Sequence, residues 1–446
     1  MRFALPRDPW PRLGSDRATR TVLLAIYAAV LIAAAAEVTR SLARQHAVIF
    51  EGYVQVGDLV LAGGDPYSLV LNTWPPFFFF VGAALALLAK VSATAALLVW
   101  QIGDALAIWG CCRLSVQLFW DDAEGLTFWP RDSGRLAFGS SAVLVPFLMT
   151  VRLFQEHLQH TQINAQVLFL VLWAFHLFRS KREVWGGLSL AVAASTKAVP
   201  VLLLPYLAYK RAWKALGWTA VFLVGLNVAL PGIVFGPART LAQWRTWRMV
   251  AARETADPIP HFMNQSVPAA LKRLTTEVGS ARDPIHYAVV DWSGTTVRAV
   301  FIALALLAAG WLAWRFRAHP GDWGDRRTAA ELAILLGAMV VVDPLAWKAH
   351  YIVLIVPYTF VWWALSRLPR DAPGRTWRWV SWWASFACIT LSAPALVGRH
   401  ARDVLESLNV ILFGALLLLG LAVSLIDMPA LGPHRVGGDP GKALSG

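Results

Sequence analysis

Residues 186–209 read G-G-L-S-L-A-V-A-A-S-T-K-A-V-P-V-L-L-L-P-Y-L-A-Y, an apolar run whose one charge is Lys197. Three basic residues stand just before this run and three stand just after it: Arg179, Lys181, Arg182, Lys210, Arg211 and Lys214. Short loops rich in Lys and Arg mark the cytoplasmic side of a membrane, so both ends of the run are expected on that side. The run therefore predicts two half-helices, one going up and one coming back, with Lys197 near the tip.

Lys197 is also the first candidate for function. A lone ammonium inside an apolar segment is costly, and such residues are by default functional-site hypotheses. Its natural partner is an anion, and a phosphate group suits it best. The alternative is a single crossing helix of residues 186–209 whose lysine reaches the far interface with its charged end.

The composition places the whole chain in the membrane. Hydrophobic residues make up 57% of it and charged residues 15%, and the apolar residues fall in blocks long enough to span a bilayer. We expect an all-α polytopic membrane protein with about 10–12 membrane helices, some of them re-entrant or broken. The net charge of +13 comes largely from short basic loops, which membrane orientation and anionic headgroups explain, so no nucleic-acid partner is expected.

Loop charges predict the topology. We expect a cytoplasmic basic N-terminus at 1–19, one membrane-embedded domain at 20–427 with outer loops 39–75 and 235–297, and a flexible cytoplasmic tail at 428–446. The arginine-rich start reads as a retained first helix near 20–38 and not as a signal peptide. Between the cytoplasmic N-terminus and the outer segment 153–164 the chain must cross the membrane an odd number of times, yet four apolar segments are available. Segment 76–91 is short and opens at Trp74-Pro75-Pro76, so it is the one expected not to cross.

This topology gathers the polar residues on one face. Residues 39–75, 153–164, 235–297, 343–350 and 396–407 all fall on the predicted non-cytoplasmic side. The expected location is a cell (inner) membrane, with both termini cytoplasmic and the functional site on the non-cytoplasmic face.

Two carboxylates in the first outer loop are candidates for general-base chemistry. Glu51 and Asp58 are seven residues apart and would share one face of a helix. A carboxylate just above the bilayer could take a proton from a sugar hydroxyl. The alternative is a solvated helix resting on the interface, with Gly63-Gly64-Asp65-Pro66 as its turn.

The other outer segments carry amides and imidazoles. Glu156, His157, His160, Gln162 and Asn164 lie within one short stretch and could bind sugar hydroxyls, or simply end a helix at the interface. No metal is expected, because there is no helical H-E-x-x-H pattern and no evident third ligand.

Two later outer stretches are polar as well. Asn264-Gln265-Ser266 lies in the long outer loop, and Asp343 to Tyr351, which includes Lys348 and His350, interrupts two apolar helices. A charged residue paired with an imidazole at such a junction is a functional candidate.

The order of these motifs resembles glycosyltransferase family 87 of the GT-C superfamily, from about residue 20 to 425. The matching elements are Gly64-Asp65-Pro66-Tyr67, Pro75-Pro76, Thr161-Gln162-Ile163-Asn164, Lys197 to Pro200, Asn264 to Ser266 and Asp343 to His350. The chain departs from the pattern in three places. No Asp stands at the usual acidic position, where Glu51 is nearest and Asp58 is the alternative; Thr161 replaces a glycine, and Ala349 replaces one histidine.

The resemblance implies a GT-C-type fold and a sugar transfer at the outer membrane face. The donor would be a polyprenyl-phosphate-linked sugar, with mannose favoured, and the acceptor a lipid or glycan; no cofactor is implied. Single displacement with inversion would use Glu51 or Asp58 as base, and Lys197 and His350 would stabilise the leaving phosphate. Gln162, Asn164, Asn264, Gln265 and Tyr67 would bind the sugar or the acceptor.

Two other classes of function stay open. A transporter or flippase of a lipid-linked saccharide would also need an intramembrane lysine and broken helices, although such proteins usually show an internal repeat and none is evident here. An inactive scaffold would explain the altered acidic position. The gathering of polar residues on one side, away from the midplane, favours the enzyme.

Overall fold

The computed structural model describes residues 48–69, 72–120, 141–277, 284–285, 287–316 and 323–428, together with Ile32, Ala36 and Arg40. The predicted tail beyond 428, most of the 119–134 loop and nearly all of the predicted first helix lie outside these residues. Within them the secondary structure is helical and contains no strand, which confirms the predicted all-α fold.

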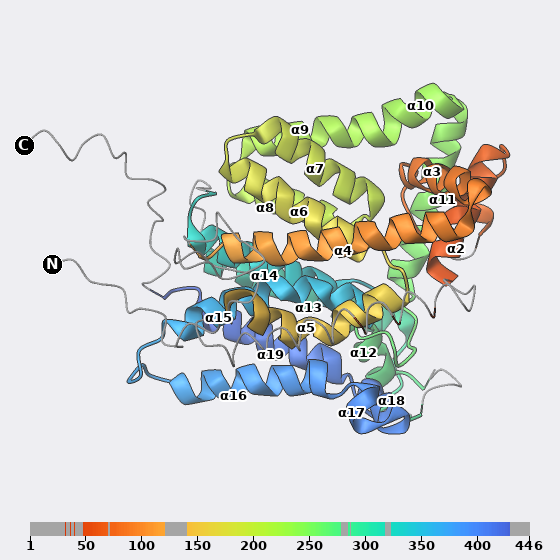
Figure 1. Ribbon diagram of the computed structural model, residues 1–446. Helices are drawn as coiled ribbons and strands as arrows, with labels where there is room; N and C mark the ends of the chain where they lie inside the picture. Colours follow the sequence, from red (N-terminus) through yellow and green to blue (C-terminus); the bar gives the residue numbers. More distant parts are fainter. Residues whose placement is uncertain are drawn as a thin grey trace, which may run out of the picture.

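The first half of the described chain runs from α2 to α11 (Figure 1). Its helices are α2 Val48–Leu61, α3 Phe78–Val91, α4 Ala93–Gln117, α5 Ser141–Gln159, α6 Asn164–Arg179, α7 Glu183–Thr196, α8 Leu203–Tyr209, α9 Trp213–Val224, α10 Leu230–Phe235 and α11 Pro237–Ala256. Short 3-10 turns stand at η1 Pro66–Ser68 and η3 Val199–Leu202, and a π turn, η4 Gly225–Ala229, joins α9 to α10.

The second half packs beneath α4 in the view of Figure 1. It consists of α12 Val267–Thr275, α13 Gly294–Phe316, α14 Arg326–Val342, α15 Ile355–Ser366, α16 Arg375–Phe386, α17 Pro394–Val397, α18 Arg399–Ser407 and α19 Val410–Leu425. The 3-10 turn η5 Lys348–Leu354 leads into α15, and the π turn η6 Ala387–Leu391 follows α16.

Several of these helices are long and apolar enough to cross a membrane. In the described part of the chain they are Ala93–Gln117, Trp213–Phe235, Gly294–Phe316 and Lys348–Ser366. The pair α18 and α19, bent by 59° at a short break, adds a fifth if it is counted as one span. The fold is thus that of a polytopic membrane protein in which full-length spans are mixed with short and broken helices.

The predicted break at Lys197 is confirmed. Thr196 ends α7, and Lys197 has an extended backbone with φ −142° and ψ 125°. Pro200 explains why α7 stops: its ring would clash with the carbonyl four residues earlier if the helix continued. The chain then returns through η3 and α8.

The packing of α7 on α9 shows that the chain reverses here. Gly187, near the start of α7, lies against Trp218 near the start of α9. Ser195, near the end of α7, accepts a hydrogen bond of 2.5 Å from Asn227 Nδ2, just beyond the end of α9. The two helices therefore run parallel, and η3 with α8 must run back between them, as two half-helices require.

Helices α2 and α3 form a close pair at the end of the molecule where α10 and α11 also lie (Figure 1). Gly57 and Gly82 allow the contact, since a Cβ on Gly57 would lie 2.0 Å from the Gly82 carbonyl oxygen. Small residues permit this close approach between membrane helices. Helix α3 has 14 residues, fewer than the about 20 a span needs, as expected for a segment that does not cross.

Polar side chains occupy two opposite ends of the helix bundle. At the start of α14 Glu331 binds Lys210 and Tyr206, and at its end stands Asp343. Glu331 and Asp343 are 12 residues apart along α14 and its end, which separates them by roughly 18 Å. We name them the Lys210 end and the Asp343 end.

The segments predicted to share one face meet at the Asp343 end. Arg239 of α11 donates to the Gly64 carbonyl, and Trp100 donates to the carbonyl of Thr161. Asn264 donates to the Pro344 carbonyl, and Gln265 to that of Glu406. The convergence of polar segments expected from the sequence is therefore a property of the fold.

Candidate functional site

The break at Lys197 is tied to the turn that begins α6. Lys197 Nζ donates a hydrogen bond of 2.6 Å to Asn164 Oδ1, and Asn164 Nδ2 donates to the Ala349 carbonyl at 3.2 Å. Gln162 Oε1 lies 3.4 Å from the same amide nitrogen. Asn164 and Gln162 are buried, whereas Lys197 is half-buried. Asn164 thus holds the ammonium, Gln162 orients the Asn164 amide, and the Lys197 side chain stays partly exposed.

Asp343 is the carboxylate whose charge acts on Lys197. It follows the last turn of α14, and its Oδ1 accepts a hydrogen bond of 3.1 Å from the Leu345 N–H. The two charged groups make no direct ion pair, although both are half-buried. Asp343 and Lys197 therefore face a shared polar region without neutralising each other in contact.

Burial sets the charge states of this pair. Lys197 lies at the break in an apolar hairpin, where loss of hydration disfavours the charged ammonium. Burial raises the pKa of the Asp343 carboxyl, a direction that Glu254 of α11 reinforces and that Lys197 and the Leu345 N–H oppose. Shifts of this kind gather at functional sites.

His350 has a defined tautomer and follows Ala349, whose carbonyl accepts the Asn164 amide that holds Lys197. The Trp347 N–H donates to His350 Nδ1 at 3.3 Å, which makes Nδ1 an acceptor and assigns the ring proton to Nε2. The ring is half-buried and interacts electrostatically with Lys197. An ammonium and an imidazole N–H at one place can together bind an anionic oxygen.

Asn264 and Gln265 are buried and fully engaged within the protein. Asn264 donates to the carbonyls of Ile259 and Pro344 and accepts from the N–H groups of Ser266 and Ala346. Gln265 donates to two carbonyls and accepts from the Ile411 N–H. In this structure Asn264 fixes the loop that carries Asp343, and the Gln265 side chain ties its own segment to α18 and α19. Their predicted sugar-binding role stays a prediction.

The residues expected in the first outer loop lie apart from one another. Asp58 is exposed and lies 3.8 Å from Lys90 Nζ in a surface ion pair. Glu51 is half-buried and lies in the first turn of α2. Tyr53, two residues later, packs on Trp100 with ring centroids 5.1 Å apart. Tyr67 donates its hydroxyl to the Trp74 carbonyl at 3.0 Å and so closes the loop.

The turn before α6 explains one departure from the family pattern. Thr161 has φ +49°, in the left-handed region that a β-branched residue rarely adopts. The pattern has glycine at this position, and glycine adopts positive φ without a steric penalty. The chain keeps the turn with a threonine whose carbonyl accepts the Trp100 indole N–H.

One buried pair was not expected from the sequence. Asp104 of α4 lies 3.0 Å from His157 Nε2, and both side chains are fully buried. Asp104 is a lone acid inside an apolar span, which by itself marks a candidate functional residue. That signal was available in the sequence, but the pairing depends on the contact of α4 with α5.

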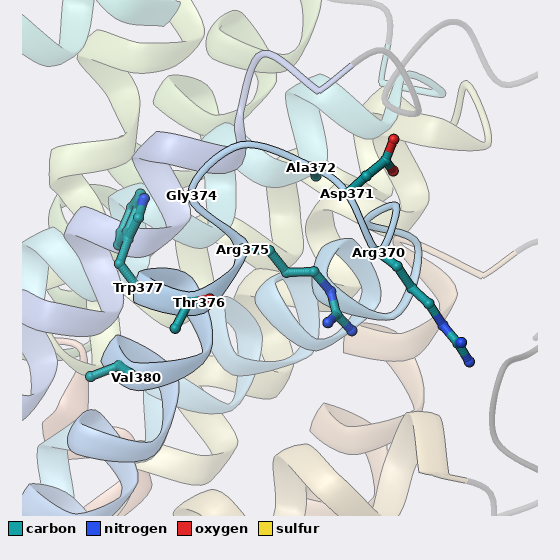
Figure 2. Close-up of a pocket in the computed structure, with 8 residues that line it drawn as sticks. All are labelled: Arg370, Asp371, Ala372, Gly374, Arg375, Thr376, Trp377 and Val380. Atoms are coloured by element: carbon teal, nitrogen blue, oxygen red, sulfur yellow. The ribbon is translucent and has the colours of Figure 1, made fainter.

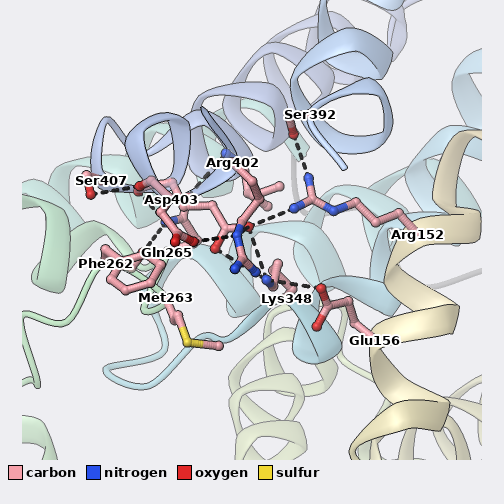
Figure 3. Close-up of polar contacts among 12 residues, drawn as sticks. Arg152, Glu156, Phe262, Met263, Gln265, Lys348, Ser392, Arg402, Asp403 and Ser407 are labelled. Atoms are coloured by element: carbon pink, nitrogen blue, oxygen red, sulfur yellow. Dashed lines mark hydrogen bonds and ion pairs between the residues drawn. The ribbon is translucent and has the colours of Figure 1, made fainter. Parts of the chain in front are cut away.

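A second unexpected feature is an ion network under the Asp343 loop (Figure 3). Lys348 Nζ lies 3.0 Å from both Glu156 Oε1 and Glu406 Oε1, and Arg152 lies 2.7 Å from Glu406. Arg152 also donates to Ser392 Oγ at 2.5 Å. The network joins α5, η5 and α18 and anchors the segment that carries His350.

A separate open pocket of about 570 Å³ lies between α15 and α16 (Figure 2). It is lined by Arg370, Asp371, Ala372, Gly374, Arg375, Thr376, Trp377 and Val380. None of the predicted site residues lines it, so it is distinct from the cluster around Lys197.

The geometry therefore defines a helical membrane protein with an accessible cation, an imidazole donor and a carboxylate gathered at one end of its bundle. Comparison with known proteins agrees with this class. The chain belongs to glycosyltransferase family 87, whose family model matches residues 72–344. No curated protein and no solved structure matches the chain.

Membership identifies a membrane glycosyltransferase and confirms the family resemblance. The matched range contains some of the predicted site residues, namely Gln162, Asn164, Lys197, Asn264 and Gln265. Others fall outside it, namely Glu51, Asp58, Tyr67 and His350. The match to the family model therefore gives no support to the predicted roles of these four residues.

Proposed function

We propose that this protein transfers a hexose, mannose favoured, from a polyprenyl-phosphate-linked donor to a lipid or glycan acceptor. The observation that carries the proposal is the half-buried Lys197 ammonium at the tip of a helix break, held by Asn164, whose amide also binds the Ala349 carbonyl next to His350. In such a reaction negative charge develops on the leaving phosphate oxygen. Preorganised cationic and N–H donors at that point stabilise the transition state more than the ground state.

The membrane position of the site fits a lipid-linked donor. The hairpin of α7, η3 and α8 lies among apolar helices, so a polyprenyl chain could lie along them while its phosphate reaches Lys197. Exposed apolar side chains line the neighbouring α9 and α10, among them Val224, Val228, Ile233 and Val234. We place the active site on the non-cytoplasmic face, because the opposite Lys210 end carries the basic loops.

Single displacement with inversion is the mechanism we propose. One carboxylate takes the acceptor proton while Lys197 and His350 bind the departing phosphate. Asn164 holds the ammonium and Gln162 orients Asn164, while Asn264 holds the Asp343 loop and Gln265 binds α18 and α19, so these amides act chiefly as positioning residues. The proposed transfer thus uses protein side chains for each of these roles.

Sugar transfer in nanodiscs from polyprenyl-phosphate-mannose tests the proposal. Lys197→Ala should lower kcat/KM by roughly 100-fold or more, because the leaving oxygen loses its counter-charge. Lys90→Ala is the matched control, since Lys90 is an exposed lysine at 59% side-chain exposure and its ion pair with Asp58 lies at the surface.

Three results would count against it. Full turnover by Lys197→Ala would remove the central element. Movement of intact donor across the bilayer without release of polyprenyl phosphate would favour a transporter. Absence of transfer from every lipid-linked sugar tested, by a folded wild type, would favour an inactive scaffold.

A further inference from the structure

The buried pair of Asp104 and His157 has no part in the transfer steps described above, although it lies inside the helix bundle. Asp104 Oδ1 lies 3.0 Å from His157 Nε2, and both side chains are fully buried. Ionisable side chains at membrane depth are costly and usually serve a function. The function of this pair follows from what it holds in place.

Three side chains on one face of α4 bind the chain just before α6. Trp100 Nε1 donates to the Thr161 carbonyl at 3.1 Å, and Gln101 Nε2 donates to a carbonyl in the last turn of α5 at 3.3 Å. Asp104 binds the His157 ring. Residues three and four positions apart are neighbours on a helix surface, so these side chains act together. Helix α4 thus holds the end of α5 and the following turn at three points.

The contacts continue from this turn to the ammonium. The Gln162 N–H donates to the His157 carbonyl at 3.2 Å. Gln162 Oε1 lies 3.4 Å from Asn164 Nδ2, and Asn164 Oδ1 accepts from Lys197 Nζ at 2.6 Å. A continuous series of contacts therefore runs from Asp104 in α4 to Lys197.

The turn needs this support because its backbone is strained. Thr161 has φ +49°, a region that is unfavourable for a β-branched residue. Such a conformation persists when the surrounding structure over-determines it. Trp100, Gln101 and Asp104 are all buried against the turn or the end of α5, and they supply that constraint.

We propose that the Asp104–His157 pair is a positioning element for Lys197, an inference that rests on the proposed transfer function. The pair fixes the end of α5, and the turn transmits that position to Asn164. Asn164 then sets where the ammonium meets the donor phosphate. A displacement of about 1 Å in a positioned group can cost about 100-fold in rate, so a contact remote from the substrate can govern transfer.

The hydrogen bond between the two side chains carries this role. Within the part of the chain that the structure describes, His157 Nδ1 has no hydrogen-bond partner, so Asp104 supplies the polar contact that fixes the ring. Asp104→Ala removes that contact. Asp104→Asn keeps nearly the same volume and an oxygen that can still accept the Nε2–H. A role that required a carboxylate to carry a proton would be lost in both variants.

Sugar transfer by these two variants tests the proposal. We expect Asp104→Ala to lower kcat/KM by about 10- to 100-fold, because the ammonium is displaced. Asp104→Asn should stay within about threefold of wild type, because the hydrogen bond is retained. Equal losses in the two variants would overturn the proposal. Tyr206→Phe is the matched control, since it removes a buried hydrogen bond of 2.8 Å to Glu331 at the Lys210 end and should leave transfer unchanged.

A double variant shows whether the pair acts through Asn164. Asn164→Ala breaks the series of contacts next to Lys197. In that protein Asp104→Ala should lower transfer by a further factor below about threefold, because the two changes interrupt the same series. Full multiplication of the two separate losses would show that the pair acts by another route and would overturn the proposal.

Trp100→Phe repeats the comparison with less risk to folding, because the aromatic ring is kept and only the N–H that binds Thr161 is lost. It should lower kcat/KM by about 3- to 10-fold in wild type, and by less in the Asn164→Ala protein. Equal factors in the two proteins would contradict the proposed route.

Hydrogen exchange gives a readout that does not depend on transfer. Asp104→Ala should speed the exchange of amides in residues 158–164 and leave those around Tyr206 unchanged, because the turn loses one of its three contacts with α4. Unchanged exchange in 158–164 overturns the proposal. If wild-type protein transfers no sugar, the proposed function fails and the role of the pair in transfer falls with it. Equal transfer by wild type and Asp104→Ala overturns the positioning role alone.

Discussion

Lys197 shows how a single residue combines a structural cost with a function. Removing an ammonium from water is unfavourable unless a partner compensates for the lost hydration. Among the residues that the structure describes, Asn164 is the one that hydrogen bonds to the Lys197 ammonium. A phosphate at this position would supply the missing counter-charge, which is why we infer that substrate binding completes the site.

This residue predicts an alkaline limit to activity. Lys197 must be charged to bind phosphate, so kcat/KM should fall at alkaline pH as the ammonium loses its proton. Bound phosphate favours the charged form, so the corresponding limb of kcat should lie at higher pH. The pH dependence of initial rates from pH 6 to 10 measures both limbs.

Lys197→Arg is the diagnostic variant, because guanidinium stays charged throughout this range. We expect weakened transfer whose alkaline limb has disappeared. Persistence of the same limb in the arginine variant would show that another group titrates there.

At the level of elements, the contact of α2 with α3 decides where the first outer loop lies. The two helices meet where Gly57 and Gly82 face each other, and a side chain on either would strike backbone. The loop between them carries Tyr67 and ends at Trp74, which packs on Tyr53 with ring centroids 4.9 Å apart. Separating the helices would therefore move the loop as well.

Gly57→Ala should destabilise the protein by about 1–3 kcal/mol, because the added methyl has no space and the helices must shift. Thermal unfolding in detergent measures the effect. Gly103→Ala is the matched control: Gly103 is also helical, in α4, and nothing lies within 4 Å of the added Cβ. Equal melting temperatures for the two variants would contradict the close contact.

At the level of the whole molecule, the network around Glu406 joins parts that are remote in sequence. Glu406 of α18 binds Arg152 of α5 and Lys348 of η5, and its side chain is fully buried. Gln265 donates to its carbonyl as well. The Asp343 loop, the turn before α6 and the last bent helix pair are thus held as one unit.

Glu406→Ala should cost about 3–5 kcal/mol, because it leaves two buried cations without their shared partner. Asp403→Asn, on the same helix, removes only a more exposed pair with Arg402 and should cost about 1 kcal/mol or less. Unfolding curves of both variants in the same detergent compare the two. Similar losses would show that the buried network contributes no more than a surface pair.

The site divides into residues that sequence reasoning could find and residues it could not. Lys197 and His350 stand out because charge and imidazole are rare in apolar runs, and the structure brings them together. Asp343 was visible beside His350, yet nothing in its own segment shows that it acts on Lys197, some 146 residues earlier. Glu51 and Asp58 are seven residues apart, which places both side chains on one face of a helix. That spacing does not predict which other helices the face contacts.

The sequence by itself determined the membrane class, the helical fold, the break at Lys197 and the convergence of the polar segments. Those properties follow from hydropathy, from loop charge and from proline geometry, all of which act locally along the chain. Only the tertiary structure decided that Lys197 binds Asn164, that Asn264 holds the Asp343 loop, and that Asp104 pairs with His157. Those outcomes depend on how distant helices pack, because a side chain's partners are set by contacts that its own neighbours in sequence do not encode.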